Sequence, residues 1–334
     1  MITCFGETML RLSPPGALRI AQAQSFDIVF GGAESNVGAA LANFGEEVRW
    51  VSKMPCNEVA DACLRWMRSF GMDVSKVVRG GQRMGVFFLE KGASLRPSKV
   101  IYDRKGSAIS EARPEDFDWN DILGDTDAFF FTGITPAIGE TLPGIVEDAL
   151  AVCREKGIPV FCDINYRPTL WSPENAGAVM RKLIRGLHTL VANEEHADLL
   201  LGVKSDLAGD DKLCDIAAKL CETYDIGRVV LTLRQSHSSD DNTVGAVMYD
   251  STTGEFVKSK EYRVHIVDRV GGGDALSAGL IYCTGLGLGA QETIEFASAA
   301  NALKHSVHGD ALIASADEVR KLAESSDGTV RMIR

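Results

Sequence analysis

The segment DRVGGGDALSAGLIY (268–282) carries the clearest chemical signal in the sequence, because three glycines and an aspartate precede a run typical of a helix. Glycines let the backbone turn tightly and bring its N–H groups against a ligand. A helix that follows adds unpaired amides and the positive end of its dipole. Gly271, Gly272 and Gly273 are therefore predicted to bind a phosphate, or the charge that develops on one.

Asp274 stands directly after these glycines. A carboxylate at this position can take a proton from an attacking hydroxyl. The alternative is that the glycines only form a loop and Asp274 caps the helix, since aspartate is a favoured N-cap residue. Neither GxGxxG nor GxxxxGK[ST] fits the segment, which argues against a dinucleotide site or a P-loop.

A second glycine pair, Gly31 and Gly32, precedes a predicted helix whose first turn holds Glu34, Ser35 and Asn36. Short polar side chains at the start of a helix commonly cap it. They can also hydrogen-bond the hydroxyls of a polyol, for which two glycines leave space. Both interpretations are open from the residues alone.

Asp163, Asn165 and Arg167 lie at the carboxyl end of a predicted strand. Open parallel sheets bind their ligands at these ends, and alternate residues of a strand point the same way. We therefore expect the three side chains to converge. Arg104, in the polar segment 100–108, supplies a second guanidinium. Two arginines near a sugar site indicate a substrate with a carboxylate, which arginine binds through paired hydrogen bonds.

Apolar runs alternate with amphipathic ones through the middle of the chain. The runs start roughly 30 to 40 residues apart, which is typical of βαβ units and predicts a parallel sheet with helices on both faces. A helix is expected to end at Gly157, and the chain is expected to be mainly helical from about residue 274. The predicted strands are 128–134, 158–164, 189–193 and 228–233.

Two stretches, 26–32 and 85–106, are rich in strand-forming residues with no helix between their strands. KVIYDR within the second stretch alternates apolar and polar residues, as a half-exposed strand does. We predict a small antiparallel sheet on the α/β body, acting as a lid. Its segments are placed at about 12–30 and 84–108 of a single domain spanning 1–334.

The composition excludes several classes of function. Acidic residues number 46 and basic residues 35, so the net charge is −11, which argues against general binding to nucleic acid or anionic membranes. The eight cysteines are scattered without a CxxC pair, so no disulfide framework is expected. No membrane span or signal peptide is recognisable, and we expect a cytoplasmic protein.

In these segments the chain resembles the ribokinase-like carbohydrate kinases of the phosphofructokinase-B family. GGAESN is similar to the family's N-terminal sugar-binding signature, and DRVGGGD to its C-terminal signature, usually DTxGAGD. The resemblance covers essentially the whole chain. It is strongest to the members that phosphorylate 2-keto-3-deoxygluconate, through the stretches GETMLRLSPPG, RPSKVIYDRKGSAIS, DINYRPTLW and LKHSVHGD.

The resemblance implies a three-layer α/β/α fold with a mostly parallel central sheet and a small β-sheet lid. It also implies transfer of the γ-phosphoryl group of ATP to the terminal hydroxyl of 2-keto-3-deoxy-D-gluconate. Another sugar kinase, of the fructokinase or ribokinase type, and an inactive sugar-binding relative are the alternatives. Because the family often dimerises through its lid sheets, a homo-oligomer formed in this way is implied as well.

Site residues are implied by their matching positions. Asp274 matches the catalytic base and residues 271–273 match the anion hole. Phe87 stands where a tyrosine is often found. The implied sugar contacts are Gly32, Glu34, Asn36, Phe87, Tyr102, Arg104 and Arg167.

For the cofactors, the resemblance implies ATP and Mg²⁺, with a monovalent cation as a further candidate. Asn193 matches the asparagine of an NxxE element that organises Mg²⁺ through water, so Asn193 and Glu195 are the metal candidates. His196 replaces the acid of that element, and TLRQSHSSDDN (232–242) replaces the TxGxxG turn of the wider family. The implied nucleotide contacts are Asn193, Thr232, Arg234 and Gly273.

Overall fold

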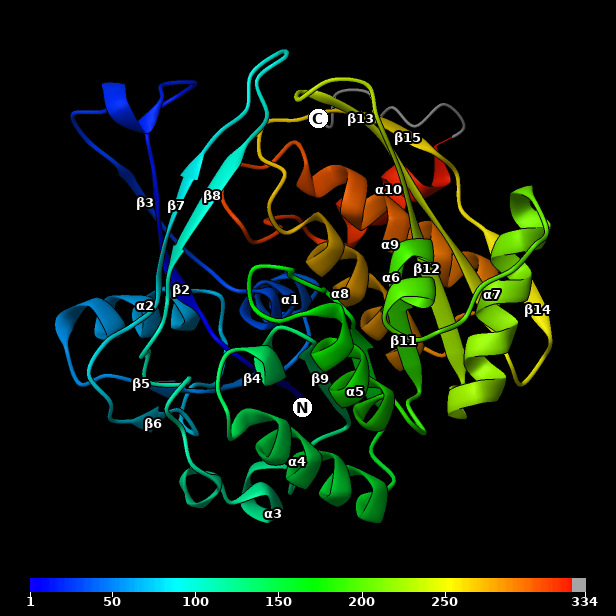
Figure 1. Ribbon diagram of the computed structural model, residues 1–334, viewed down its shortest axis with the longest axis horizontal. Helices are drawn as coiled ribbons and strands as arrows, with labels where there is room; N and C mark the ends of the chain where they lie inside the picture. Colours follow the sequence, from blue (N-terminus) through cyan, green and yellow to red (C-terminus); the bar gives the residue numbers. More distant parts are fainter. Residues whose placement is uncertain (326–334) are drawn as a thin grey trace.

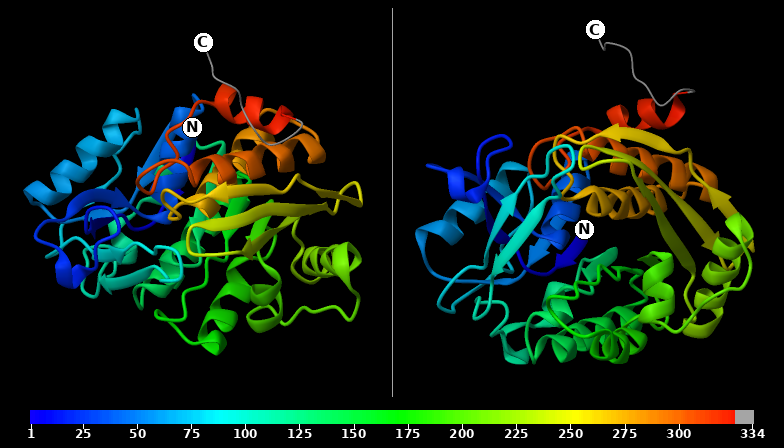
Figure 2. Two further views of the ribbon diagram at one scale, coloured as in Figure 1. Left: turned by 90° about the horizontal axis from the view of Figure 1, so that it is seen from above. Right: turned by 45° about the horizontal axis from the view of Figure 1, so that its top comes forward.

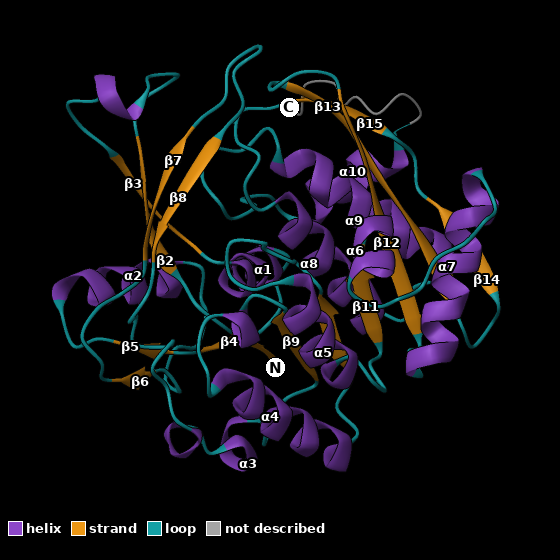
Figure 3. Ribbon diagram, viewed as in Figure 1, coloured by secondary structure: helices purple, strands orange, loops and turns teal. Residues whose placement is uncertain are grey.

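The computed structural model describes residues 1–325, so 326–334 of the predicted single domain lie outside the described residues. A mostly parallel sheet forms its centre, in the order β14-β13-β12-β11-β10-β9-β1-β4, with β15 paired to β13 (Figures 1 and 3). The pairs from β4 to β12 are parallel, and β13 pairs antiparallel with β12, β14 and β15. The strands are β1 (Ile2–Phe5), β4 (Val48–Val51), β9 (Ala128–Thr132), β10 (Val160–Asp163), β11 (Thr189–Ala192), β12 (Arg228–Ser236), β13 (Asp241–Asp250), β14 (Glu255–Lys258) and β15 (Tyr262–His265).

The four predicted strands are confirmed as the neighbours β9, β10, β11 and β12. The predicted α/β class with a mostly parallel sheet is confirmed too, and the chain is mainly helical after residue 271, as expected. The helix expected to end at Gly157 does so, with that residue in the left-handed conformation at φ 68°. The helices are α1 (Ala33–Asn43), α2 (Glu58–Ser69), α3 (Trp119–Ile122), α4 (Leu142–Lys156), α5 (Pro173–Leu183), α6 (Glu194–Leu199), α7 (Gly209–Tyr224), α8 (Gly272–Gly285), α9 (Ala290–Lys304) and α10 (Ala316–Glu324).

Helices cover both faces of the central sheet, as Figure 2 shows. Strand β9 illustrates why, because its successive side chains point to opposite faces. Phe130 packs into the core formed with α1, α8 and α9. Phe129 and Phe131 pack into the opposite core, formed with α4, α5 and α7. A strand buried on both faces therefore needs the unbroken apolar run found at 128–131.

A second sheet stands beside the central one, in the order β3-β2-β7-β8. The prediction of an antiparallel sheet is wrong for one pair, because β2 and β7 run parallel. A chain can reach the parallel position only through a long crossover, and here α1, β4 and α2 intervene between the two strands. The strands are β2 (Met9–Ser13), β3 (Asp27–Gly31), β7 (Val86–Glu90) and β8 (Lys99–Asp103), and the short pair β5 (Lys53–Met54) and β6 (Val78–Arg79) lies apart.

The tip of the β7–β8 hairpin touches the tip of the β12–β13 hairpin (Figure 1). The Ser239 amide donates to the Ser94 carbonyl at 3.0 Å, and the Ser94 amide donates to an Asp240 carboxylate oxygen at 2.7 Å. The Ser239 hydroxyl donates to the Arg96 carbonyl at 2.8 Å. The second sheet and the end of the central sheet are therefore joined across a gap of more than 140 residues in sequence.

All eight cysteines are free thiols, as the scattered pattern predicted. Within residues 1–325, none of the helices combines the length and the apolar character that a membrane crossing requires.

We predict that Phe131→Ala lowers the free energy of unfolding by about 3–5 kcal/mol, because it empties a fully buried aromatic site in the core. Denaturant unfolding followed by fluorescence or circular dichroism measures the loss. Leu95→Ala is the control, since this side chain is 94% exposed and its loss should change stability by less than about 0.5 kcal/mol. Equal effects of the two substitutions would contradict the packing described for β9.

Candidate active site

A cavity of about 330 Å³ lies between the second sheet and the carboxyl ends of the central strands. We call it the inner cavity. It brings together all seven sugar contacts implied by the sequence and all four residues of the predicted anion hole and base. These residues come from segments as far apart as 31–36, 87–104, 163–167 and 269–274.

The glycine loop owes its shape to Gly271, the N-cap of α8, which has a φ of 88°. A Cβ atom there would lie 1.8 Å from the Asp310 carbonyl oxygen, so only glycine fits. Helix α8 begins at the next residue, and the first amides of a helix have no carbonyl partner within it. Residues 271–273 line the inner cavity, so these amides have the arrangement with which helix N-termini bind anions.

Asp274 is the third residue of α8 and does not cap it. The alternative in which it serves as the N-cap is therefore wrong, because Gly271 occupies that position. The Asn36 amide of α1 donates to the Asp274 carboxylate at 2.8 Å. Burial raises the pKa of Asp274 to about 6, while the hydrogen bond from Asn36 lowers it. The carboxylate is thus ionised at neutral pH and oriented by the N-terminal signature.

Glu34 is anchored to the end of β9. Its Oε1 accepts hydrogen bonds from the Thr132 amide at 3.1 Å and from the Thr132 and Thr135 hydroxyls, both at 2.7 Å. Burial raises the pKa of Glu34 to about 7. The Glu34 side chain therefore does not cap α1, and its carboxyl group borders the inner cavity.

Asp163, Asn165 and Arg167 all line the inner cavity, but not for the expected reason. Strand β10 ends at Asp163, and Asn165 has a left-handed φ of 39°, so strand alternation does not align the three. A turn does so instead, in which the Asn165 amide donates to the Asp163 carboxylate at 2.9 Å. Burial raises the pKa of Asp163 to about 7, and the nearby charge of Asp274 raises it as well.

Arg104 is already paired in this structure. Its Nε donates to Glu7 Oε2 at 2.8 Å, its Nη2 contacts the same oxygen, and both residues are buried. Its guanidinium lies 5.5 Å from the ring centre of Tyr102, which packs against Phe87. Arg167 is exposed and makes no ion pair with residues 1–325, so its charge is available to a ligand. Sequence reasoning missed Glu7, since nothing near it in the sequence reveals a partner at position 104.

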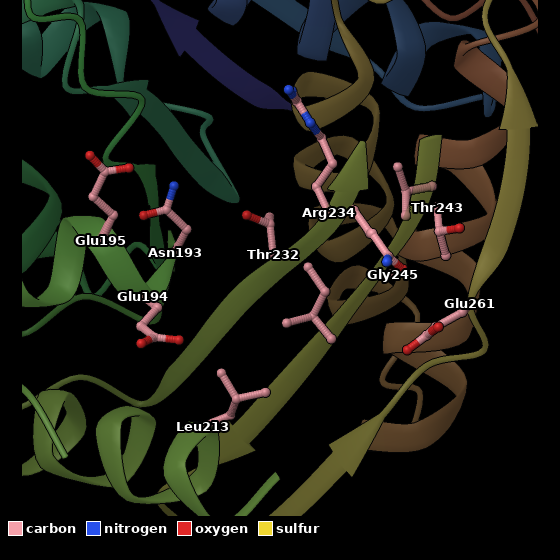
Figure 4. Close-up of a pocket in the computed structure, with 12 residues that line it drawn as sticks. Asn193, Glu194, Glu195, Leu213, Thr232, Arg234, Thr243, Gly245 and Glu261 are labelled. Atoms are coloured by element: carbon pink, nitrogen blue, oxygen red, sulfur yellow. The ribbon is translucent and has the colours of Figure 1, made fainter. Parts of the chain in front are cut away.

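A larger cavity of about 710 Å³ opens beside the inner one (Figure 4). We call it the outer cavity. Asn193 and Glu195 lie on one side of it, and Thr232 and Arg234 of β12 lie on the other. Of the implied nucleotide contacts, only Gly273 belongs to the inner cavity alone. Arg234 lines both cavities, so the two meet at this guanidinium.

Asn193 also caps α6, because its Oδ1 accepts from the His196 amide at 2.7 Å. His196 does not line the outer cavity; burial lowers its pKa to about 4, which keeps the ring neutral. Glu194 pairs with Lys212 at 2.5 Å, whereas Glu195 is exposed at the cavity. In the part of the chain that the structure describes, no three His, Cys, Asp or Glu side chains cluster closely enough to hold a metal ion directly.

Comparison with known proteins gives consistent matches over nearly the whole chain. A family model described as "pfkB family carbohydrate kinase" matches residues 1–316. A 2-dehydro-3-deoxygalactonokinase of Haloferax volcanii is 32% identical, with 98% of each chain covered. A 2-dehydro-3-deoxygluconokinase of Thermoproteus tenax is 26% identical over 92% of this chain and 89% of the relative.

Solved structures agree with the sequence matches. The crystal structure of a 2-dehydro-3-deoxygluconokinase from Thermotoga maritima superimposes with a TM-score of 0.94 at 45% identity, covering 97% of this chain and 98% of the other. A structure described as a putative 2-keto-3-deoxygluconate kinase from Enterococcus faecalis has a TM-score of 0.89 at 27% identity, covering 100% and 98% of the two chains.

We predict that Asn36→Ala raises the pKa of Asp274 by about 1, because it removes a hydrogen bond to the charged carboxylate. Carbon-13 NMR titration of the aspartate carboxyl groups measures the shift, with Asp274→Asn identifying the resonance. Ser35→Ala is the matched control one position away, since the Ser35 hydroxyl donates to the Gly32 carbonyl instead. An unchanged Asp274 titration in Asn36→Ala would remove the amide from this role.

Proposed function

Because the chain belongs to the pfkB family of carbohydrate kinases, we propose that it transfers the γ-phosphoryl group of ATP to the terminal hydroxyl of 2-keto-3-deoxy-D-gluconate. One observation carries the proposal: the inner cavity holds a helix N-terminus, a buried ionised aspartate and an unpaired arginine together. The names of the relatives from Thermoproteus tenax and Thermotoga maritima support the choice of substrate.

Phosphoryl transfer asks little covalent chemistry of a protein, and depends mainly on alignment and on stabilising charge. In the proposed reaction the sugar hydroxyl oxygen attacks the γ-phosphorus, and its proton passes to Asp274. The bond from the γ-phosphorus to the bridging oxygen breaks, and ADP leaves. The amides at the start of α8 face the equatorial oxygens of the transferred group.

The outer cavity is the proposed site of ATP. Its volume of about 710 Å³ is in the range of small-molecule sites. Thr232 and Asn193 line it, and Arg234 marks its junction with the inner cavity. A γ-phosphate placed at this junction lies beside both the guanidinium and the glycine loop.

Mg²⁺ fits the outer cavity as a water-held ion. It is usually bound by one or two carboxylates together with substrate phosphates and waters. Glu195 is an exposed carboxylate at the cavity and Asn193 lies beside it, so these two residues would hold the hydrated ion. When bound, Mg²⁺ would neutralise charge on the phosphates. A monovalent cation stays a prediction without an assigned site.

The carboxylate of the substrate is proposed to bind Arg167. Arg104 is the less available guanidinium, since Glu7 already accepts from it. We further propose that the second sheet acts as the lid of a single domain, that the protein assembles as a homo-oligomer through this sheet, and that it works in the cytoplasm. Two exposed apolar side chains of this sheet support the assembly, Ile28 of β3 and Ile101 of β8.

Asp274→Asn should retain the fold and ligand binding but lose turnover by about 10²–10⁴-fold, because the proton acceptor is replaced by an isosteric amide. A coupled assay of ADP release measures turnover, and calorimetry with the sugar acid checks that binding survives. Wild-type kcat in this variant would exclude Asp274 as the base. Binding without turnover in the wild-type protein would favour the inactive sugar-binding alternative.

Arg167→Ala should raise KM for 2-keto-3-deoxygluconate by about 10- to 100-fold, the cost of a lost charge-assisted contact. The KM values for neutral sugars should stay unchanged. The wild-type panel includes D-fructose, D-ribose and 2-keto-3-deoxygalactonate, the last because the Haloferax relative is named for that epimer. A wild-type preference for fructose or ribose would refute the substrate while leaving the kinase family intact.

A further inference from the structure

A cluster of buried charges lies behind the glycine loop. Arg11 is fully buried, and its Nη2 donates to Asp268 at 2.6 Å while its Nη1 donates to Asp310. Lys304 is fully buried as well, and its ammonium donates to the Val307 carbonyl at 3.0 Å. Two buried cations and two carboxylates thus share a space from which water is almost excluded, and at its edge the partly buried Lys91 lies 3.7 Å from Asp268. The proposed mechanism uses none of them.

The cluster joins three separate parts of the fold. Arg11 lies in the middle of β2, the strand of the second sheet that pairs with both β3 and β7. Asp268 opens the glycine loop, and its Oδ2 also accepts from the Gly309 amide at 3.3 Å. Asp310 follows α9 in the loop that leads to α10. A single guanidinium therefore connects the second sheet to both loops behind the anion site.

Asp310 lies between the two glycine signatures and contacts Gly31 of one and Gly271 of the other. Its carbonyl oxygen lies 1.8 Å from the position that a Cβ on Gly271 would take. Its Oδ2 lies 1.9 Å from the corresponding position on Gly31. The backbone of each signature therefore rests directly on Asp310. A displacement of this residue would move the anion site and the start of the sugar-binding segment together.

From this geometry we propose that Arg11 is a positioning residue for phosphoryl transfer, fixing Asp268 and Asp310 so that the glycine loop is aligned with a sugar held under the second sheet. The proposal rests on the proposed roles of the glycine loop and Asp274. Arginine suits this task because its planar fork can hold two carboxylates in fixed directions, whereas lysine offers a point charge on a flexible stem. Misplacement of reacting groups by about 1 Å can cost about 10²-fold in rate.

Lys304 balances the cluster electrically. Burial lowers the pKa of Lys304, and the neighbouring charges of Asp268 and Asp310 raise it. Its Cε lies 3.2 Å from the position of a Cβ on Gly271, so it also packs against the turn. With Lys304 charged, both aspartates stay compensated and available to the two arms of Arg11.

The chain supplies a matched control in Arg49 of β4. It also holds two aspartates, with Nε donating to Asp73 at 2.9 Å and Nη1 to Asp125 at 2.6 Å. It is 7% exposed and lines neither cavity. Arg11→Lys and Arg49→Lys thus each weaken an arginine that bridges two aspartates, fully buried ones behind the glycine loop for Arg11 and more exposed ones away from it for Arg49.

The experiment compares kcat, KM for ATP and sugar acid, and melting temperature in wild type, Arg11→Lys and Arg49→Lys, assayed where all three are folded. Both variants should melt at lower temperature. Arg11→Lys should lose about 10- to 100-fold in kcat. Both KM values should stay within about twofold of the wild-type values, and the acid limb of the pH–rate profile should keep its position. Arg49→Lys should keep its kcat. An Arg11→Lys enzyme with normal kcat, or with a change only in KM, would overturn the proposal.

Asp268→Asn provides a second variant should Arg11→Lys fail to fold. It keeps the shape of the side chain and weakens the same ion pair. We expect a comparable fall in kcat, and in the double variant no additional fall, because the two residues act as one unit. Additive losses or an unaltered kcat would count against the proposal. Failure of the proposed function would show separately, as sugar binding without turnover in the wild-type enzyme, and failure of the proposed base as full turnover in Asp274→Asn.

Discussion

The structure depends on one constraint: the start of α8 must leave its first amides unpaired and facing the inner cavity. Gly271 satisfies it by adopting a left-handed conformation against the Asp310 carbonyl, a position where any side chain would collide with backbone. Asp274 then falls on the first turn of the helix, where the positive end of the dipole favours its charge. The proposed proton acceptor and the proposed phosphoryl-binding amides are thus placed by the same four-residue segment.

Electrostatics explain how this cavity, in an acidic protein, can accept the proposed anionic substrate. Five carboxyl groups line it, and burial raises the pKa of Glu34 and Asp163 to about 7 and that of Asp274 and Asp310 to about 6. Glu34 and Asp163 therefore carry only part of a charge near neutrality. The remaining negative charge of the carboxylates is offset by four arginines that line the cavity, Arg104, Arg167, Arg234 and Arg269.

The sequence predicted the parts of the site that lie close together along the chain. The glycines and Asp274 stand in one segment, and apolar runs in the sequence predict the strands of the parallel sheet. It could not predict partners set by tertiary structure. Nothing at position 7 reveals that Glu7 holds Arg104, and nothing at position 11 reveals the aspartates that meet Arg11. The parallel pairing of β2 with β7 was missed for the same reason. The turn at Asn165 is local instead, and was missed because strand alternation was assumed to continue beyond Asp163.

The hydrogen bonds between the tips of the β7–β8 and β12–β13 hairpins affect the rate at which the inner cavity can open. The inner cavity has Tyr102 of the second sheet on one wall and Arg234 of β12 on the other, and the three hydrogen bonds made by Ser94, Ser239, Asp240 and Arg96 tie those walls together. Each such bond contributes about 1 kcal/mol net. Their combined strength is modest enough for thermal fluctuations to part the walls within microseconds to milliseconds. If the second sheet acts as the proposed lid, release of a product from the inner cavity would require the tips to separate, and this step would then limit turnover.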